Sequence, residues 1–178
     1  NSKVNIIYCK SNLGVGGATI KGFQKALDEK NDIIFKIDGD GQHNPEEISK
    51  FLKKFENQSI NYCKGSRFIN SVDKAKIPFF RRFGNIILTN ISKLTCKNNT
   101  ITDVVNGFLG IRSSLLKKIN LNKISKDFFF EEDLLFNICL FENYIEEVEI
   151  ETFYNDNNKS NLNPFKTIIP FIFKHLKN

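Results

Sequence analysis

A nearly continuous apolar run at residues 33–37 ends directly on an acidic turn, Asp38-Gly39-Asp40, and this junction constrains the fold most strongly. A strand that is apolar along almost its whole length is typical of a parallel sheet covered on both faces. Periodicity also predicts strands at residues 4–9, 60–65 and 145–153, and helices at 16–30, 44–57, 78–96 and 131–142. Strands that alternate with helices predict an α/β fold with a mainly parallel sheet flanked by helices.

The chain has the size and composition of one folded unit. Its 178 residues are 40% hydrophobic and 26% charged, which excludes a disordered chain and fits a single core. We predict one domain over residues 1–163, followed by a basic, apolar segment at 164–178. We expect that segment to form an amphipathic helix or tail that can lie on a membrane surface. No run of about 18 apolar residues occurs, so no segment is predicted to span a bilayer.

The positive charge of the chain favours an anionic partner. A formal net charge of +6 fits phosphates, a nucleic acid or an acidic membrane surface. Basic residues are scattered and no nucleic-acid motif occurs, so nucleic acid is not the expected partner. The cysteines form no Cys-x-x-Cys pair and lie in apolar stretches, which predicts buried, reduced thiols and a cytoplasmic location. They are Cys9, Cys63, Cys96 and Cys139.

The acidic turn lies where α/β sheets bind their ligands, at the carboxyl end of a strand. The carboxylates of Asp38 and Asp40, on a turn loosened by glycines, can converge on one hard cation whose other ligands are phosphate oxygens and water. The alternative is a solvated surface turn. An EF-hand is excluded because His43 and Ser49 occupy the positions of its glycine and glutamate. A helix start follows, with Asn44 as N-cap and a proline after it.

A glycine-rich stretch at residues 12–18 precedes the first predicted helix. It does not match a dinucleotide-binding fingerprint, because Thr19 stands where the third glycine is required, and it contains no Walker A lysine. Two interpretations remain open. The glycines allow either a tight turn near phosphates or close packing of the helix.

Several separate stretches, taken in order, resemble one family: the inverting family 2 glycosyltransferases of the GT-A fold, particularly the dolichyl-phosphate and polyprenyl-phosphate sugar synthases. The stretches are residues 12–18, 37–46, 64–68, 81–85, 103–108 and 130–135. The most specific is Ile-Asp-Gly-Asp-Gly-Gln-His-Asn-Pro-Glu at 37–46. The resemblance implies a Rossmann-like sheet. Because the chain begins after two strands that hold the donor's base and ribose in the family, we expect an N-terminally incomplete catalytic domain that lacks the first βαβ segment.

The resemblance also implies ligands for a metal and a donor. It implies that Asp40 and Gln42, with help from Asp38, hold Mg²⁺ or Mn²⁺, and that Asp38 also contacts a UDP- or GDP-linked sugar. Such an ion neutralises the leaving diphosphate. Ser66, Arg67, Arg81 and Arg82 are implied to bind substrate, since guanidinium groups suit the phosphate of a polyprenyl-phosphate acceptor.

The acidic residues near the end of the chain, and Asp103 before them, each have two possible roles. The resemblance implies that Glu132, Asp133 or the neighbouring Glu131 supplies a general base, although carboxylates also suit the first turn of a helix. Asp103 either orients the acceptor or braces its loop. The implied acceptor is a lipid phosphate or a glycan, met in the cytoplasm or at the cytoplasmic face of a membrane. Rival interpretations are a sugar-nucleotide nucleotidyltransferase and a non-catalytic binding module.

Overall fold

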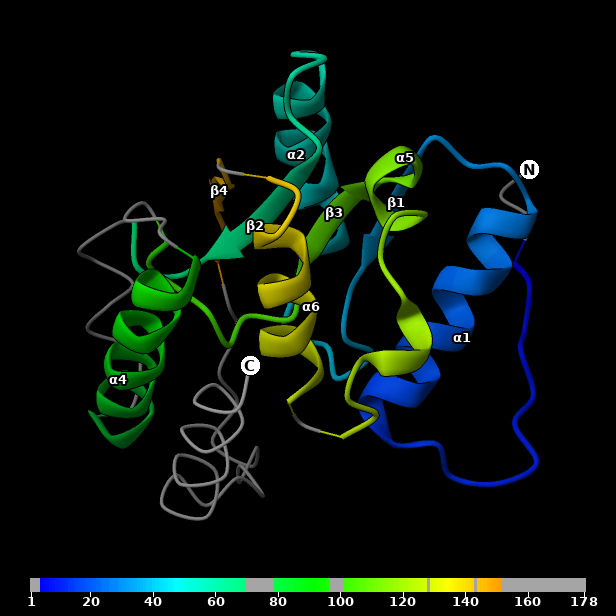
Figure 1. Ribbon diagram of the computed structural model, residues 1–178, viewed down its shortest axis with the longest axis horizontal. Helices are drawn as coiled ribbons and strands as arrows, with labels where there is room; N and C mark the ends of the chain where they lie inside the picture. The colour runs from blue at the N-terminus through cyan, green and yellow to red at the C-terminus, as the bar shows by residue number, and fades with distance from the viewer. Residues whose placement is uncertain (1–3, 70–78, 97–100, 128, 143, 152–178) are drawn as a thin grey trace.

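A computed structural model of the chain describes residues 4–69, 79–96, 101–127, 129–142 and 144–151 (Figure 1). Its centre is one four-stranded sheet with the order β1-β3-β2-β4. The strands are β1 Ile33–Lys36, β2 Tyr62–Ser66, β3 Leu109–Arg112 and β4 Glu146–Glu149. The α/β class with flanking helices is therefore confirmed.

The sheet is mixed. β3 pairs antiparallel with both β1 and β2, whereas β2 and β4 are parallel. It follows that β1, β2 and β4 share one direction and that β3 runs against them between β1 and β2. The expectation of a mainly parallel sheet needs this correction, because two of the three pairings involve β3, a strand that periodicity did not predict.

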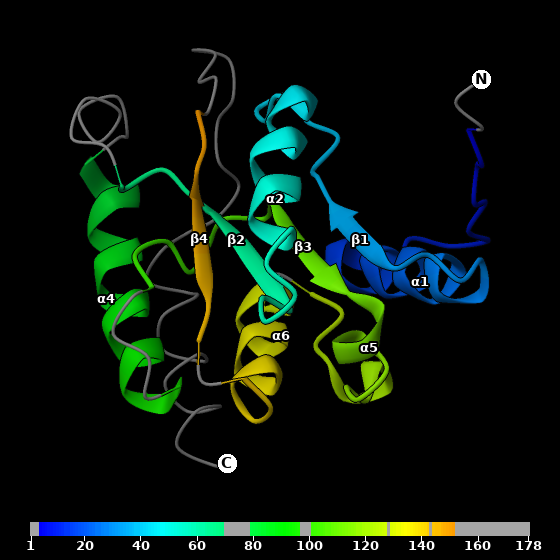
Figure 2. The ribbon, with the colours of Figure 1, turned by 90° about the horizontal axis from the view of Figure 1, so that it is seen from above.

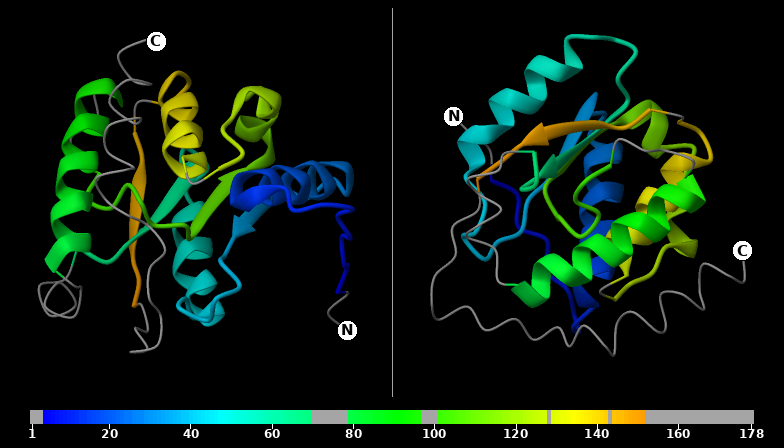
Figure 3. Two further views of the ribbon diagram at one scale, coloured as in Figure 1. Left: turned by 90° about the horizontal axis from the view of Figure 1, so that it is seen from below. Right: turned by 90° about the vertical axis from the view of Figure 1, so that its left-hand side faces the viewer.

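Helices cover both faces of the sheet (Figure 2). The longer ones are α1 Gly14–Asp28, α2 Ile48–Phe55, α4 Phe79–Cys96 and α6 Phe130–Cys139, and the short ones are η1 Pro45–Glu47, α5 Ser113–Leu116 and η2 Leu121–Lys123. One core cluster joins α1 and α6 to one face, and a second joins α2 to the other. Neighbouring residues of β2 divide between them, since Tyr62 belongs to the first cluster and Cys63 to the second. Figure 3 shows α4 beyond β4 and α1 at the opposite end, beside β1.

The start of the α2 region follows its sequence signals. The side chain of Asn44 accepts a hydrogen bond from the backbone N–H of Glu46 at 3.0 Å, and Pro45 occupies the first helical position. This cap begins a 3-10 turn that continues directly into α2. The acidic turn is thus bounded by a strand on one side and a capped helix on the other.

The glycine-rich stretch packs closely against the segment that precedes α6. A Cβ atom on Gly16 would lie 2.8 Å from the Cβ of Phe130, and Gly17 donates its N–H to the carbonyl of Lys126 at 3.2 Å. Gly14, with a φ of +72°, also abuts the backbone of Lys126. Of the two interpretations of this stretch, the geometry supports close helix packing.

Two sequence expectations are wrong in the structure. Residues 4–9 form no strand, since none of the strands in the described part of the chain pairs with them. Val4, Ile6 and Tyr8 are exposed. Cys63 is buried as expected, but Cys9 is exposed and Cys139 is disulfide-bonded. The argument for reduced thiols therefore fails at Cys139, and the cytoplasmic location stays a prediction.

Two further expectations concern the ends of the predicted domain and the membrane. The segment 164–178 lies outside the described residues. Within the described ranges, no helix combines the length and the apolarity needed to cross a bilayer.

The packing of β3 leads to a test of stability. A Cβ on Gly110 would meet the ring atoms of Phe35 at 2.7 Å and Phe55 at 2.8 Å, so Gly110→Ala should destabilise the fold by about 1–3 kcal/mol. Gly22, inside α1, has nothing within 4 Å of an added Cβ, and Gly22→Ala should stabilise by about 0.5–1 kcal/mol. Urea denaturation measures both changes. Equal stability of the two variants would contradict this account of the sheet.

Candidate active site

The acidic turn follows β1 and leaves its carboxylates at the surface. Asp38 is 33% exposed in its side chain, and Asp40 is exposed. The backbone N–H of Gln42 donates to a carboxylate oxygen of Asp40 at 3.0 Å, which closes the turn, and Gly41 supplies the φ of +74° that the turn requires. Because Asp40 is exposed, its carboxylate can be reached from solvent.

Lys36, the last residue of β1, connects this turn to α6. Its Nζ lies 2.7 Å from Oδ1 of Asp38 and 2.8 Å from Oε1 of Glu131, and its side chain is only 7% exposed. Burial lowers the pKa of Lys36, but the carboxylates of Glu131 and Asp38 outweigh burial and raise its pKa overall. The sequence analysis missed Lys36. The available signal was a lysine inside an otherwise apolar strand.

His43 lies among the charged groups of the turn. Its ring centroid is 5.4 Å from that of Phe108, and its Nδ1 is buried without a hydrogen-bond partner. Burial lowers the pKa of His43, Asp38 and Asp40 oppose that shift, and Arg67 adds to it. The two aspartates follow β1 and Arg67 follows β2, and because these strands run in the same direction the three residues lie at one edge of the sheet.

Arg67 and Asp103 form a forked ion pair. Nε of Arg67 lies 2.7 Å from Oδ2 of Asp103, and an Nη donates to Oδ1 at 2.9 Å. The Asp103 carboxylate is fully buried and also accepts the backbone N–H of Arg67 at 3.2 Å. Of the two roles expected for Asp103, the geometry favours bracing, because its oxygens are committed to Arg67.

The loop that carries Asp103 is fastened to β4. Glu147 accepts the backbone N–H of Thr102 at 2.8 Å and that of Asp103 at 3.1 Å, and it accepts the Thr102 hydroxyl at 2.6 Å. Ser66 is fully buried, and its hydroxyl lies 2.6 Å from that of Thr102. Ser66 therefore lies in the protein interior, where it contacts Thr102. Glu147, which the sequence analysis missed, supports the loop that carries Asp103.

The acidic residues at the start of α6 reach different places. Glu131 contacts Lys36, whereas Oδ2 of Asp133 accepts the backbone N–H of Ser125 at 2.8 Å. Glu132 is buried, and one of its oxygens has no hydrogen-bond partner. Burial raises the pKa of Glu132 to about 8. Glu131 is the member of the three that joins the acidic turn, whereas the sequence analysis put Glu132 and Asp133 ahead of it.

The fully buried Lys64 supports the same region from β2. Its Nζ donates to the backbone carbonyl of Asn106 at 2.5 Å. Burial lowers the pKa of Lys64, and the carboxylates of Asp103, Glu131 and Glu132 oppose that shift. A buried lysine thus sits beneath the loop and the helix start that carry the candidate acids.

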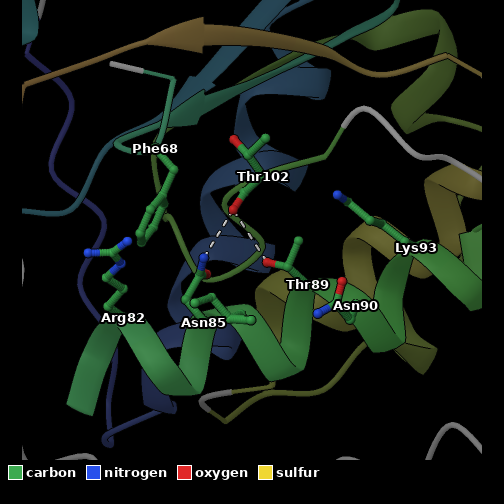
Figure 4. Close-up of a pocket in the computed structure, with 8 residues that line it drawn as sticks. Phe68, Arg82, Asn85, Thr89, Asn90, Lys93 and Thr102 are labelled. Atoms are coloured by element: carbon green, nitrogen blue, oxygen red, sulfur yellow. Dashed lines mark hydrogen bonds between the residues drawn. The ribbon is translucent and has the colours of Figure 1, made fainter. Parts of the chain in front are cut away.

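A hollow of about 240 Å³ lies between α4 and the Thr102 loop (Figure 4). It is lined by Phe68, Arg82, Asn85, Ile86, Thr89, Asn90, Lys93 and Thr102. Asn85 donates to the Thr102 carbonyl at 3.0 Å, which holds α4 to the loop. Arg82 and Lys93, both cations, lie at the two ends of the part of α4 that lines the hollow. Arg81 lies in the same helix, but its side chain is outside the described set.

The residues of the turn fit a divalent ion that arrives with a phosphate ligand. In the part of the chain that the structure describes, no group of three or more His, Cys, Asp and Glu side chains could hold a metal. Asp40, Asp38 and the side-chain amide of Gln42 supply hard oxygen ligands but too few to complete the shell of Mg²⁺ or Mn²⁺. An ion held by these side chains would need further ligands from outside the protein.

Known glycosyltransferases are similar to this chain in sequence. The dolichyl-phosphate N-acetylglucosaminyltransferase of Methanococcus voltae, which uses UDP-N-acetylglucosamine by name, is 33% identical over 86% of this chain and 61% of its own length. The undecaprenyl-phosphate mannosyltransferase of Micrococcus luteus is 27% identical over 83% of this chain and 60% of its own. The chain thus spans about three fifths of these relatives.

A solved structure shares the fold. Glucosyl-3-phosphoglycerate synthase of Mycobacterium tuberculosis, in complex with Mn²⁺ and UDP-glucose, superposes with a TM-score of 0.64 at 12% identity, over 94% of this chain and 56% of that one. This likeness supports the GT-A fold alone. Residues 1–120 match the family described as glycosyl transferase family 2, and the chain belongs to that family of glycosyltransferases.

Proposed function

We propose that this chain is the catalytic part of an inverting glycosyltransferase. The enzyme moves a sugar from a UDP- or GDP-sugar to a polyprenyl or dolichyl phosphate. The observation that carries the proposal is that Asp38 and Asp40 follow β1 and Arg67 follows β2, two strands that run in the same direction, so that all three residues lie at one edge of the sheet. Carboxylates that bind a metal diphosphate and a guanidinium that binds a phosphate are the two kinds of group that this transfer requires. The names of the relatives support a lipid phosphate as the acceptor.

In this proposal the donor binds at the acidic turn. Asp40 and Gln42, with help from Asp38, would hold Mg²⁺ or Mn²⁺, and Asp38 would also contact the donor's sugar or ribose. When bound, the ion acts as a Lewis acid that neutralises the leaving diphosphate. Attack from the face opposite the diphosphate inverts the configuration at the anomeric carbon.

The state of the acidic side chains supports a phosphate acceptor over a sugar hydroxyl. A hydroxyl needs a general base, but Glu131 is paired with Lys36, and Glu132, with a pKa of about 8, is mostly protonated at neutral pH. Asp103 is committed to Arg67, and Asp133 is buried and accepts the backbone N–H of Ser125. An acceptor phosphate is already ionised at neutral pH, so it attacks without losing a proton to the protein.

Loss of the exposed aspartate tests the metal role. Asp40→Ala should lower nucleoside diphosphate release by roughly 100-fold or more, because the leaving diphosphate loses its counter-ion, while the melting temperature stays close to wild type. The assay screens UDP- and GDP-sugars with MnCl₂ and a short polyprenyl phosphate. Asp28→Ala, an exposed aspartate in α1, is the matched control and should keep wild-type release. Near-normal transfer by Asp40→Ala would refute the metal role.

The buried Glu132 predicts how stability depends on pH. Its pKa is raised from 4.5 to about 8 in the folded chain, so the native state holds the proton more tightly than the unfolded state. The free energy of unfolding should therefore fall as the pH rises between these values. Glu132→Gln removes that loss and should be more stable than wild type at pH 8.5, by on the order of 2–4 kcal/mol, and similar to it at pH 5.

Urea denaturation at both pH values measures the difference. The control is Glu56→Gln, an exposed glutamate after α2, which should follow the wild-type pH dependence. If Glu132→Gln and wild type lose stability in parallel from pH 5 to pH 8.5, Glu132 is not held protonated in the fold.

A further inference from the structure

Lys36 is a buried cation with two carboxylate partners from different parts of the chain. It contacts Asp38, two residues later, and Glu131, which lies 95 residues further on. Lys36 is 7% exposed and Glu131 12%, whereas Asp38 is 33% exposed. Asp38 is thus the member of this group that faces outward, and its two partners lie behind it.

The backbone of Gly107 packs closely against Asp38 and Lys36. A Cβ on Gly107 would overlap Oδ2 of Asp38 and lie 2.5 Å from Nζ of Lys36. The Gly107 segment is itself fixed, because Lys64 donates to the Asn106 carbonyl at 2.5 Å. One oxygen of Asp38 therefore faces an ammonium group, and the other faces a backbone that leaves no room for a side chain.

These contacts restrict the carboxylate of Asp38 to one orientation. Without the ammonium group of Lys36, the carboxylates of Asp38 and Glu131 would face each other unshielded, and like charges repel strongly in a partly buried site. Asp38 would then turn toward solvent. Lys36 thus links the first turn of α6 to the acidic turn and restricts the orientation of Asp38.

We infer that Lys36 is a positioning residue of the active site, which holds the Asp38 carboxylate in place against Gly107 and links it to Glu131, at the turn where a metal-bound nucleoside diphosphate would bind. This inference rests on the proposed function. Lys36 itself touches no substrate in this role. Groups that orient a metal site from behind typically account for about 10–100-fold in metal affinity or activity.

The test compares Lys36→Met with Lys36→Arg. Binding of Mn²⁺ in the presence of UDP, and separately of GDP, is measured by electron paramagnetic resonance, and kcat and KM are measured for the donor that the screen identifies. We expect Lys36→Met to weaken nucleotide-dependent Mn²⁺ binding by about 10-fold and to lower kcat by at least as much. Lys36→Arg, which keeps the cation, should restore a large part of both.

A lysine outside the site serves as the matched control. Lys25 pairs with Glu29 at 3.2 Å on the surface of α1, and Lys25→Met should leave Mn²⁺ binding and kcat unchanged. If Lys36→Met fails to fold, the double variant Lys36→Met with Glu131→Gln removes the unpaired buried carboxylate. This double variant should fold and still bind nucleotide-dependent Mn²⁺ about 10-fold more weakly than wild type.

The outcomes separate this inference from the function on which it rests. If wild type binds Mn²⁺ with UDP or GDP, and both Lys36→Met and the double variant bind it equally well with unchanged kcat, the positioning role is wrong and the proposed function stands. If wild type shows neither nucleotide-dependent Mn²⁺ binding nor release of nucleoside diphosphate with any donor, the proposed function fails, and the role of Lys36 in it fails too.

Discussion

Charged groups buried beneath the acidic turn must find partners inside the fold, because an unpaired ion away from water costs several kcal/mol. Here each partner comes from a distant segment. Lys36 of β1 meets Glu131 of α6, Arg67 after β2 meets Asp103, and Glu147 of β4 holds the Asp103 loop. The groups that form the candidate site are therefore also the contacts that join β1, β2, β4 and α6. The same contacts therefore join these elements and arrange the residues of the candidate site.

Local signals determined how much of the fold the sequence could predict. The Asn44 cap, the long helices and the strand before Asp38 depend on short-range patterns, and all appear in the structure. A strand also needs a partner, which no local pattern encodes. Residues 4–9 have β-rich composition but no neighbour to pair with, whereas Leu109–Arg112 is short and pairs on both sides. The direction of β3 follows from these pairings and could not be inferred from its four residues.

The candidate site divides in the same way. Residue type and position were enough to single out Asp38 and Asp40, whereas the family resemblance singled out Arg67, and the structure places the three at one edge of the sheet. The supporting partners were not predictable, because the contact between Arg67 and Asp103 spans 36 residues. Lys36 and Lys64 nevertheless left a trace in the sequence. Each is a lysine within a strand, and a lysine there must either reach solvent or meet a buried acceptor.

The glycine-rich stretch affects the candidate site through its packing against the segment that leads into α6. Gly14 and Gly16 allow α1 to approach the segment at Lys126, which leads directly into α6. That approach fixes where α6 starts and hence where Glu131 stands relative to Lys36 and the acidic turn. A side chain at Gly16 would displace the start of α6 before it touched any ligand. In this chain the glycines therefore act on the candidate site through packing, and direct contact with phosphate is not needed to explain why glycine occupies those positions.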